Sequence, residues 1–519
     1  MTQQPVFRQE LTPISFLTRS ASVHAERVAV EDGELRFTYR EWYERARCFA
    51  SALRRAGVGD GDRVAFVAVN SEPLLLAHFA VPMANAILVA INIRLLPDDI
   101  GWIVGHCGAR LCFFSPELAP LVEQLPEGVR RIDIGQGLEQ LLHTGSADEK
   151  LPPLRSEDDV LAIDYTSGTT GRPKGVMYHH RGAHLNAVVM VEDLRLRPGS
   201  RYLWTLPMFH CNGWTCTWGT VAAGACNVCI PRIDVEWVWR EFGRGAVDAL
   251  CAAPTVMTML VNAADAQPLP RPVRVMTAGA PPSPTLLAQM GELGFDVVHV
   301  YGLTETYGPF TVNVMPPGAE RLPAAERARL AARQGVPNLL AGELRVVDDS
   351  MADVPWDGET LGEVLARGNV IMKGYYAAPE ATEEAFAGGW FHTGDVGVWH
   401  PDGSIELRDR KKDVIISGGE NTSTIEVEQA VVSHPAVLEC AVIAIPDERW
   451  GEVPKAFVAL KPQATASERE IIDHCRARLA HFKCPAAVAF CELPKTGTGK
   501  IQKFVLREQE WGASDRRIN

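Results

Sequence analysis

Short β-rich runs alternate with segments of helical periodicity along much of this chain. Residues 38–58 place apolar side chains at helical spacing up to Gly57, and the β-rich run 62–70 follows directly. Similar runs, each ended by Gly, Pro or a polar turn, recur at residues 226–231, 273–279 and 295–302. Strands that alternate with helices predict an α/β fold with largely parallel sheets, in which ligands collect at the carboxyl ends of strands.

The pattern changes towards the carboxyl end. Residues 342–349 and 360–368 are typical of short strands, and Pro401-Asp402-Gly403 is typical of a hairpin turn. A compact set of elements follows the charged run 410–413, with helices expected at 425–433 and 467–480 and strands at 440–446 and 455–461. We therefore predict a large α/β N-terminal domain of stacked sheets, flanking helices and a small β region (1–410), a domain boundary near residue 411 and a small α+β C-terminal domain (413–519).

The composition excludes several classes of protein. The 519 residues include 51 Lys and Arg against 64 Asp and Glu, a formal charge of −13. This balance argues against nucleic-acid binding, which needs clustered cations, but permits a small anionic ligand. The apolar stretch 74–89 is too short to span a bilayer, and residues 1–17 lack the segments of a signal peptide. Twelve irregularly spaced cysteines predict reduced, mostly buried thiols and a cytoplasmic location.

The segment Tyr165–Val176, YTSGTTGRPKGV, is the strongest local signal and directly follows the apolar run 161–164. Glycine permits close backbone approach, backbone N–H groups and hydroxyls donate to phosphate oxygens, and Lys174 adds a positive charge. The segment differs from the Walker pattern GxxxxGK[ST], which disfavours an ATPase of that type. It predicts an anion-binding loop, and a surface turn rich in small polar residues is the alternative.

Four further segments follow this loop in order: YGLTET (301–306), HTGD (392–395), RDRKKDVIISGGEN (408–421) and PKTGTGKI (494–501). With the loop, they closely resemble the adenylate-forming superfamily of acyl-CoA synthetases, peptide-synthetase adenylation domains and luciferases. The resemblance extends from about residue 15 to residue 508 and implies the two-domain fold of that superfamily. The stretch PMFHCNGW (207–214) and GGEN (418–421) are most similar to the branch that activates short- to medium-chain or aromatic acids.

The resemblance implies an ATP site. It assigns the β- and γ-phosphates to Thr166, Ser167, Gly168, Thr169, Thr170, Gly171 and Lys174. Tyr301 and the turn Gly279–Pro281, which includes Ala280, would flank the adenine, and Gly302 is a further nucleotide-binding position. Asp395 would accept from the ribose hydroxyls, and Arg410 would add a donor nearby. Thr304 would donate to the α-phosphate. Glu305 would hold Mg²⁺, a hard cation that prefers carboxylate and phosphate oxygens.

Lys500 is the leading catalytic candidate, and Thr304, Glu305 and His210 are the other catalytic candidates. It follows a flexible TGTG run, and the resemblance implies that it bridges the substrate carboxylate and the α-phosphate. Two anions must approach in line, so a mobile point charge offsets their repulsion. The resemblance also implies a hinge at residues 411–412, so that the small domain swings about Lys412 before CoA reacts. It further implies that Gly418 and Gly419 border the CoA tunnel.

The acyl pocket is assigned to His210, Trp214 and Gly302. His210 either gates the thiol entrance or packs, and Trp214 either limits one wall of the pocket or belongs to the core. Residues 210–216 contain too few ligands for zinc, so Glu305 is the only metal residue expected. One departure from the commoner pattern is Thr422-Ser-Thr424, where Ile-x-Pro is frequent.

Three functions fit these residues. The first is an AMP-forming acyl-CoA synthetase that uses ATP, Mg²⁺, CoA and a carboxylic acid. The second is a ligase that loads an acyl carrier protein, and the third is a nucleotide-binding module without turnover. The presence of Lys500, Glu305 and Lys174 argues against the third, since a binder needs no mobile lysine at the α-phosphate. We expect a cytoplasmic protein that binds no nucleic acid and that can form a homodimer.

Overall fold

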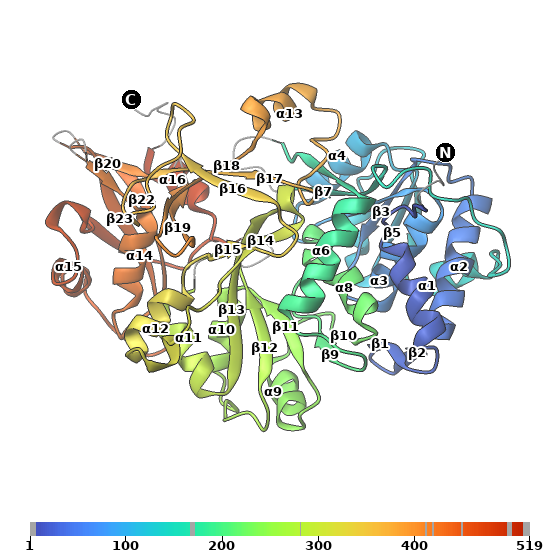
Figure 1. Ribbon diagram of the computed structural model, residues 1–519, viewed down its shortest axis with the longest axis horizontal. Coiled ribbons are helices and arrows are strands. Elements are labelled where there is room, and N and C mark those ends of the chain that lie inside the picture. The colour runs from blue at the N-terminus through green and yellow to red at the C-terminus, as the bar shows by residue number, and fades with distance from the viewer. Residues whose placement is uncertain are drawn as a thin grey trace, which may run out of the picture.

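The computed structural model describes residues 7–166, 172–280, 282–410, 413–417, 420–447, 450–495 and 501–511. One large sheet has six strands in the order β6-β5-β3-β4-β7-β8 (Figure 1). Its strands are β3 (Arg63–Val67), β4 (Ile87–Ala90), β5 (Leu111–Phe114), β6 (Arg130–Asp133), β7 (Val160–Tyr165) and β8 (Gly175–His179). All neighbours are parallel except β7 and β8, which are antiparallel and flank the predicted phosphate loop.

The other large sheet has nine strands in the order β15-β14-β13-β12-β11-β9-β10-β1-β2. They are β1 (Val28–Asp32), β2 (Leu35–Thr38), β9 (Arg201–Leu203), β10 (Cys226–Cys229), β11 (Ala249–Ala252), β12 (Val273–Thr277), β13 (Phe295–Leu303), β14 (Gly308–Val312) and β15 (Val336–Pro337). The six central strands, from β13 to β1 in this order, pair in parallel. At the two ends of the sheet, β2 pairs antiparallel with β1, and β14 pairs antiparallel with both β13 and β15.

Alternating side chains of these strands build layers. Val64 and Phe66 of β3 join a core shared by both sheets, whereas Ala65 and Val67 pack on the outer helix α4 (Pro97–Cys107). The shared core also holds α3 (Glu72–Met83), α6 (His180–Asp193) and α8 (Cys216–Ala223). Every residue of α3 is buried, as expected of a helix that is apolar all round.

The remaining helices of this region include those on the outer face of the nine-stranded sheet. The nine-stranded sheet packs on α9 (Val235–Gly243), α10 (Pro254–Val261) and α11 (Pro284–Glu292). Others are α1 (Ile14–Val23), α2 (Tyr39–Arg55), α5 (Gln136–Leu142), α7 (Cys211–Trp214), α12 (Ala324–Ala331) and α13 (Pro379–Ala385). The two predicted elements 38–58 and 62–70 correspond to α2 and β3.

Two smaller sheets complete the fold. The first is antiparallel, β16 (Glu343–Val347), β17 (Gly362–Arg367), β18 (Phe391–Trp399) and β19 (Ile405–Arg410), with residues 401–403 in the turn before β19. The second contains β20 (Ile415–Ser417), β21 (Glu420–Thr422), β22 (Val437–Asp447), β23 (Gly451–Leu460) and β24 (Ala487–Phe490). Its helices are α14 (Thr424–Val432), α15 (Glu468–Arg476) and α16 (Lys503–Trp511), at the side of the molecule away from the N-terminus in Figure 1.

The predicted fold class is confirmed: a large α/β region with a small β sheet precedes a small α+β region. The hinge residues 411 and 412 lie outside the described residues, so the exact domain boundaries stay a prediction. All twelve cysteines are described, are free of disulfides and are mostly buried. Among the described helices, none is long and apolar enough to cross a membrane.

Candidate active site

The candidate site lies where strands of the two large sheets end. β7 ends at Tyr165 and leads into the predicted phosphate loop, and β13 ends at Leu303, directly before Thr304 and Glu305. The Tyr178 hydroxyl of β8 donates to the Thr304 carbonyl oxygen at 2.6 Å. This bond joins the two sheets and brings β8, the strand that follows the predicted phosphate loop, next to the Thr304–Glu305 pair.

Three predicted nucleotide residues meet beside these strand ends. The Tyr301 hydroxyl donates to Oδ2 of Asp395 at 2.7 Å, and Nε of Arg410 lies 3.1 Å from Oδ1. Asp395 and Arg410 are direct cross-strand partners on β18 and β19. The Asp395 carboxylate raises the pKa of Arg410. The result is a buried, oriented carboxylate whose remaining acceptor capacity suits the hydroxyls of a ribose.

Glu305 and Lys174 are linked through a tyrosine that the sequence analysis did not identify. The Tyr375 hydroxyl donates to Oε1 of Glu305 at 2.9 Å, and the Lys174 ammonium lies 4.9 Å from the centre of the same ring. Burial, and then the neighbouring Glu305, raise the pKa of Tyr375, so its hydroxyl stays a donor. Tyr375 carries no motif of its own, and only the fold brings it to this place.

The carboxylate of Glu305 fits a Mg²⁺ ion that arrives with nucleotide phosphates. In the part of the chain that the structure describes, no three His, Cys, Asp or Glu side chains form a metal-binding group. Mg²⁺ is commonly held by one or two carboxylates together with substrate phosphates and water. A single half-buried glutamate matches that donor set.

The stems of the predicted phosphate loop are closed by hydrogen bonds. The Thr166 backbone N–H donates to the Lys174 carbonyl oxygen at 3.0 Å, and Lys174 itself is exposed. The intervening candidates Ser167, Gly168, Thr169, Thr170 and Gly171 lie outside the described residues. The stems are therefore positioned for an anion cradle, and the roles of the loop residues stay predictions.

Helix α4 supports both stems, a feature that the sequence analysis missed. The Tyr165 hydroxyl and Nδ1 of His106 lie 2.7 Å apart, which ties the end of β7 to the helix. The Arg172 guanidinium lies 5.2 Å from the centre of the Trp102 ring, and Trp102 stacks on His106. These aromatic contacts hold the two ends of the loop against one helix.

The predicted adenine turn follows β12. Gly279 has φ +89°, which a side chain rarely adopts, and an added Cβ would meet no neighbour within 4 Å. Ala280 is exposed, and Pro281 lies outside the described residues. The turn therefore offers an open backbone surface at a strand end, as contact with a flat base requires.

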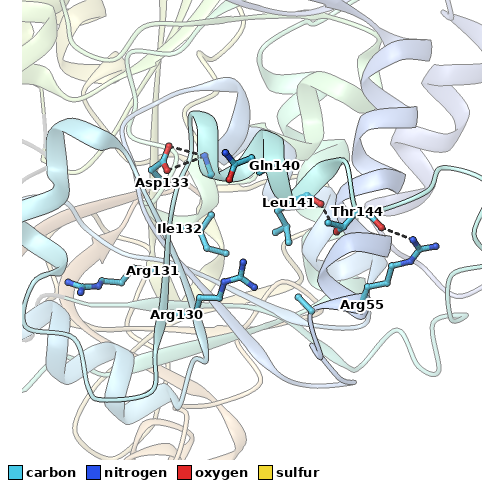
Figure 2. A pocket seen from close by; sticks show the side chains of 10 residues that line it. Arg55, Arg130, Arg131, Ile132, Asp133, Gln140, Leu141 and Thr144 are labelled. Carbon is cyan, nitrogen blue, oxygen red and sulfur yellow. Dashed lines mark hydrogen bonds between the residues drawn. The ribbon is translucent and has the colours of Figure 1, made fainter.

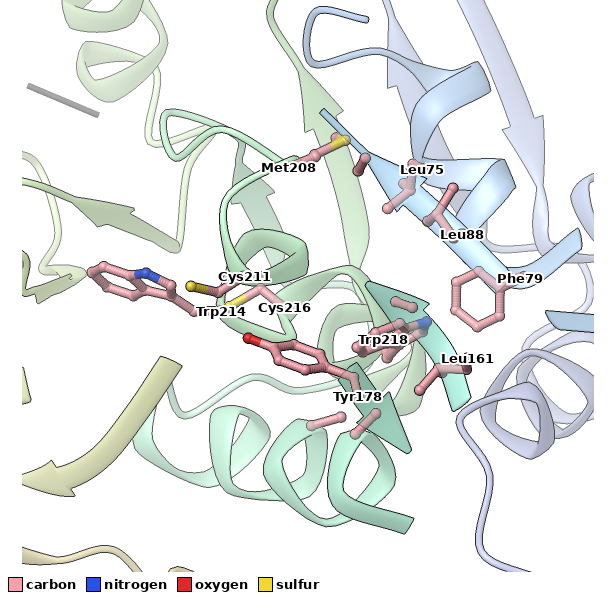
Figure 3. Close-up of a cluster of buried hydrophobic side chains, with 14 of the residues drawn as sticks. Leu75, Phe79, Leu88, Leu161, Tyr178, Met208, Cys211, Trp214, Cys216 and Trp218 are labelled. Carbon is pink, nitrogen blue, oxygen red and sulfur yellow. The ribbon is translucent and has the colours of Figure 1, made fainter. Parts of the chain in front are cut away.

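Trp214 and Gly302, two predicted acyl-pocket residues, are brought together through Gly308. A Cβ on Gly302 would lie 1.8 Å from the Gly308 carbonyl oxygen, and one on Gly308 would lie 3.0 Å from Cβ of Trp214. Trp214 is 5% exposed and belongs to the same buried cluster as Trp218, and Figure 3 shows its ring on the side of the cluster that lies away from Trp218. The β13–β14 hairpin thus packs closely against Trp214, next to the pair that follows β13.

His210 directly precedes the turn that carries Trp214 and is half-buried. Its carbonyl oxygen accepts from the Gly213 N–H at 2.9 Å. His210 therefore shares a segment with Trp214, and its role as a gate or a packing residue stays open. Cys211 is buried in the core, as the sequence analysis expects of most of the cysteines, and its thiol also donates to Oγ1 of Thr304 at 3.5 Å.

The C-terminal candidates are not placed by the structure. Lys500, Lys412, Gly418 and Gly419 lie outside the described residues. Lys495 and Ile501 pair as an antiparallel bridge on either side of the segment that contains Lys500. The assignments of the mobile lysine, the hinge and the CoA tunnel therefore stay predictions.

A separate surface cavity of about 440 Å³ lies beside β6 and α5 (Figure 2). Arg55, Arg130 and Arg131 contribute to its lining. Arg55 is already engaged, since it donates to the Thr144 carbonyl oxygen at 2.6 Å. None of the predicted site residues lines this cavity, so we do not assign the reaction to it.

Comparison with known proteins assigns the family. Residues 17–376 match the AMP-binding enzyme family, and residues 426–500 match the AMP-binding enzyme C-terminal domain. The chain is 44% identical to acetate–CoA ligase CCL3 of Humulus lupulus over 97% of this chain and 95% of that one. It is 42% identical to the peroxisomal acetate/butyrate–CoA ligase AAE7 of Arabidopsis thaliana, over 96% and 94% of the two chains.

Solved structures agree with this assignment. The anthranilate CoA ligase AuaEII in complex with anthranoyl-AMP superposes with a TM-score of 0.86 and 28% identity, covering 97% of this chain and 98% of that one. The o-succinylbenzoate CoA synthetase of Bacillus subtilis with ATP and magnesium has a TM-score of 0.83 and 27% identity, covering 95% and 99%. The shared architecture spans nearly the whole of each chain.

The fold and the site therefore define an adenylate-forming enzyme. The chain belongs to the AMP-binding enzyme family. The predicted membership is confirmed, and so is the predicted class of reaction, an AMP-forming ligation of a carboxylic acid to CoA that uses ATP and Mg²⁺.

Proposed function

We propose that this protein converts a short-chain carboxylic acid, of about two to four carbons, to its CoA thioester through an acyl-adenylate. The observation that carries the chain length is the bulky, buried Trp214, which lies against Gly308 on the turn whose Cys211 thiol donates to Oγ1 of Thr304. A tryptophan at this position leaves little depth for an alkyl chain. Relatives named for acetate and for acetate or butyrate support the same range.

In the first step a carboxylate oxygen attacks the α-phosphorus of ATP, and pyrophosphate leaves. No general base is needed, because a carboxylic acid is already ionised at pH 7. Lys174 and the loop after Thr166 hold the leaving phosphates, while Asp395 and Tyr301 orient the nucleoside. Glu305 would hold Mg²⁺, which would supply neutralising charge to the phosphates. Lys500 spans the two reacting anions.

In the second step the CoA thiolate attacks the acyl carbonyl carbon, and AMP leaves with the bonding electrons. We assign the thiol path to Gly418 and Gly419, where the absence of side chains admits a narrow arm. The C-terminal domain, residues 413–519, turns about Lys412 between the steps, so that Lys500 withdraws as the glycine segment approaches. One site thus serves two reactions in sequence.

The experiment is pyrophosphate release from ATP and Mg²⁺ across acids of two to eight carbons, with and without CoA. We expect repeated turnover only with CoA, and the highest kcat/KM for two to four carbons. A single burst that CoA does not relieve would instead indicate a carrier protein as acceptor. Silence with every acid would contradict the proposal, and a peak at longer chains would refute the role of Trp214.

Two variants separate the half-reactions. Lys500→Ala should abolish adenylation and leave thioester formation from supplied acyl-adenylate largely intact. Gly419→Leu should block the thiol step and leave the first pyrophosphate burst. Equal loss of both half-reactions in either variant would contradict the assigned division of labour.

The compartment and assembly belong to the same proposal. We propose a cytoplasmic enzyme, although some relatives are named as peroxisomal, and a homodimer. Cell fractionation with an antibody checks the first, and light scattering of the purified chain checks the second.

A further inference from the structure

The turn that carries Trp214 has an unusual backbone. Cys211, Asn212, Gly213, Trp214 and Thr215 all have positive φ, between +48° and +61°. Consecutive left-handed residues other than glycine are disfavoured, because Cβ approaches the following carbonyl oxygen. Such a conformation persists only where the surroundings enforce it, and it is concentrated at functional sites. The turn must therefore be held by specific contacts.

The strongest contacts come from Asp164, the residue before Tyr165 in β7. Its Oδ2 lies 2.5 Å from the side-chain nitrogen of Asn212, and its Oδ1 accepts from the Asn212 backbone N–H at 3.3 Å. Thr217 adds a third bond, from its hydroxyl to the Asn212 carbonyl oxygen at 3.0 Å. Asp164 and Asn212 are 2% and 0% exposed. The strand that leads to the phosphate loop thus holds the turn at the acyl side.

Unpaired atoms next to Asp164 and Asn212 indicate that the Asp164 carboxyl group carries a proton. With the amide nitrogen towards Asp164, Nε2 of His78 and Oδ1 of Asn212 are both buried and lack a partner among the described residues. The Asn212 side chain faces His78, whose Nδ1 lies 2.8 Å from the Leu74 carbonyl oxygen. All these groups are satisfied when the Asn212 carbonyl oxygen faces Asp164 and its NH₂ group faces His78. That arrangement requires a proton on Asp164.

The electrostatics agree with a neutral acid. Burial raises the pKa of Asp164 to about 8 and lowers that of His78 to about 4, so both are uncharged at pH 7. Tyr178, Cys211 and Tyr307 are the other titratable groups near Asp164, and burial raises the pKa of each. No lysine or arginine of the described part pairs with Asp164. Among the described residues, none therefore supplies a positive charge that would stabilise the ionised form of Asp164.

We propose that Asp164 and Asn212 are positioning residues: a neutral carboxylic acid donates to the amide and locks the left-handed turn that presents Trp214 to the acyl chain. The proposal rests on the proposed function, because it takes Trp214 as a wall of the acyl site. It assigns to Asp164 a role that none of the five motifs contains. In the same arrangement, the Asn212 NH₂ group donates to Nε2 of His78.

Substitution of Asp164 tests the assigned proton. In Asp164→Asn the amide N–H replaces the acid O–H as donor, so we expect KM for acid and for ATP within about threefold of wild type. In Asp164→Ala the lock is lost, and KM for the acid should rise about 10- to 100-fold while KM for ATP stays within about twofold. The preference for short acids should relax in the same variant. Equal damage by Asn and Ala would overturn the neutral-donor assignment.

Thr217→Val serves if the alanine variant fails to fold, because it is nearly isosteric and removes one bond to the turn. It should raise KM for the acid in the same direction, by less. An unchanged acid KM and chain-length profile in both Asp164→Ala and Thr217→Val would refute the positioning role.

Unfolding by urea tests the pair without any substrate. Unfolded Asp164 ionises near its usual pKa, whereas the folded acid keeps its proton to about pH 8. The stability of wild type relative to Asp164→Asn should therefore fall as pH rises from about 6 to 8. A difference that does not change with pH would overturn the proton assignment. If no acid is activated, the proposed function fails, and this measurement still decides for or against the neutral acid.

Discussion

Asp395→Asn is the sharpest test of the nucleotide site. Asp395 accepts from Tyr301 at 2.7 Å and pairs with Arg410 at 3.1 Å, and its side chain is 6% exposed. Asparagine has nearly the same shape, and its carbonyl oxygen can still face Arg410. The substitution therefore removes the charge and one acceptor without opening a cavity, so its effect reports on electrostatics and hydrogen bonding.

The magnitude follows from two contributions. A hydrogen bond to a charged group contributes about 1.5–3 kcal/mol, and the predicted ribose contact loses that charge. This corresponds to a rise of about 10- to 100-fold in KM for ATP. Removal of one partner of a buried ion pair costs about 3–5 kcal/mol of stability. Because the Arg410 side chain is 34% exposed, water replaces part of the lost interaction, and we expect about 2 kcal/mol.

The assay is pyrophosphate release at varied ATP and saturating acid, together with urea unfolding. Asp353→Asn is the matched control, since Asp353 pairs with Nε of Arg345 at 2.6 Å on the same sheet but its side chain is 56% exposed. The control should change stability by less than about 1 kcal/mol and leave KM for ATP unchanged. An equal KM for ATP in both variants would refute the ribose assignment of Asp395.

Three further tests address the rest of the site. Gly302→Ala should lower the free energy of unfolding by at least about 2 kcal/mol, because the added Cβ would overlap the backbone of Gly308. In the control Gly291→Ala, in α11, the added Cβ meets no neighbour, and the protein should be stabilised by about 0.5–1 kcal/mol. Urea unfolding of the two variants measures both changes. Trp214→Ala should shift the acid preference to longer chains, and an unchanged chain-length profile would contradict the acyl wall. Tyr375→Phe removes the donor to Glu305 and should raise the Mg²⁺ concentration needed for half-maximal pyrophosphate release several-fold, with the acid KM unchanged.

Much of the fold could be predicted from sequence because its elements carry local signals. The expected helix 38–58 became α2, which begins at a Thr38 capping box, and the expected strand 295–302 became β13. The turn at 401–403 follows from residue types that favour turns. Element ends differ by a few residues, because end positions depend on capping and packing that periodicity does not report.

In the candidate site too, the residues within motifs could be predicted from the sequence, and the residues outside motifs could not. Tyr301, Asp395 and Arg410 each lie in a motif, and the structure brings all three together. Tyr375 was not predicted, because a tyrosine outside any motif acquires its role only when the chain brings it against Glu305. The residues of the predicted phosphate loop and Lys500 stay predictions.

The sequence by itself determined the α/β class, the order of the motifs and the chemistry of the reaction. These properties reside in periodicity and in runs of adjacent residues, which any fold of the chain must keep. Only the tertiary structure decided that Asp164 meets Asn212 and that residues 211–215 take a left-handed turn. Local propensity disfavours that backbone, so contacts between distant segments had to impose it, and no pattern of neighbouring residues announces such contacts.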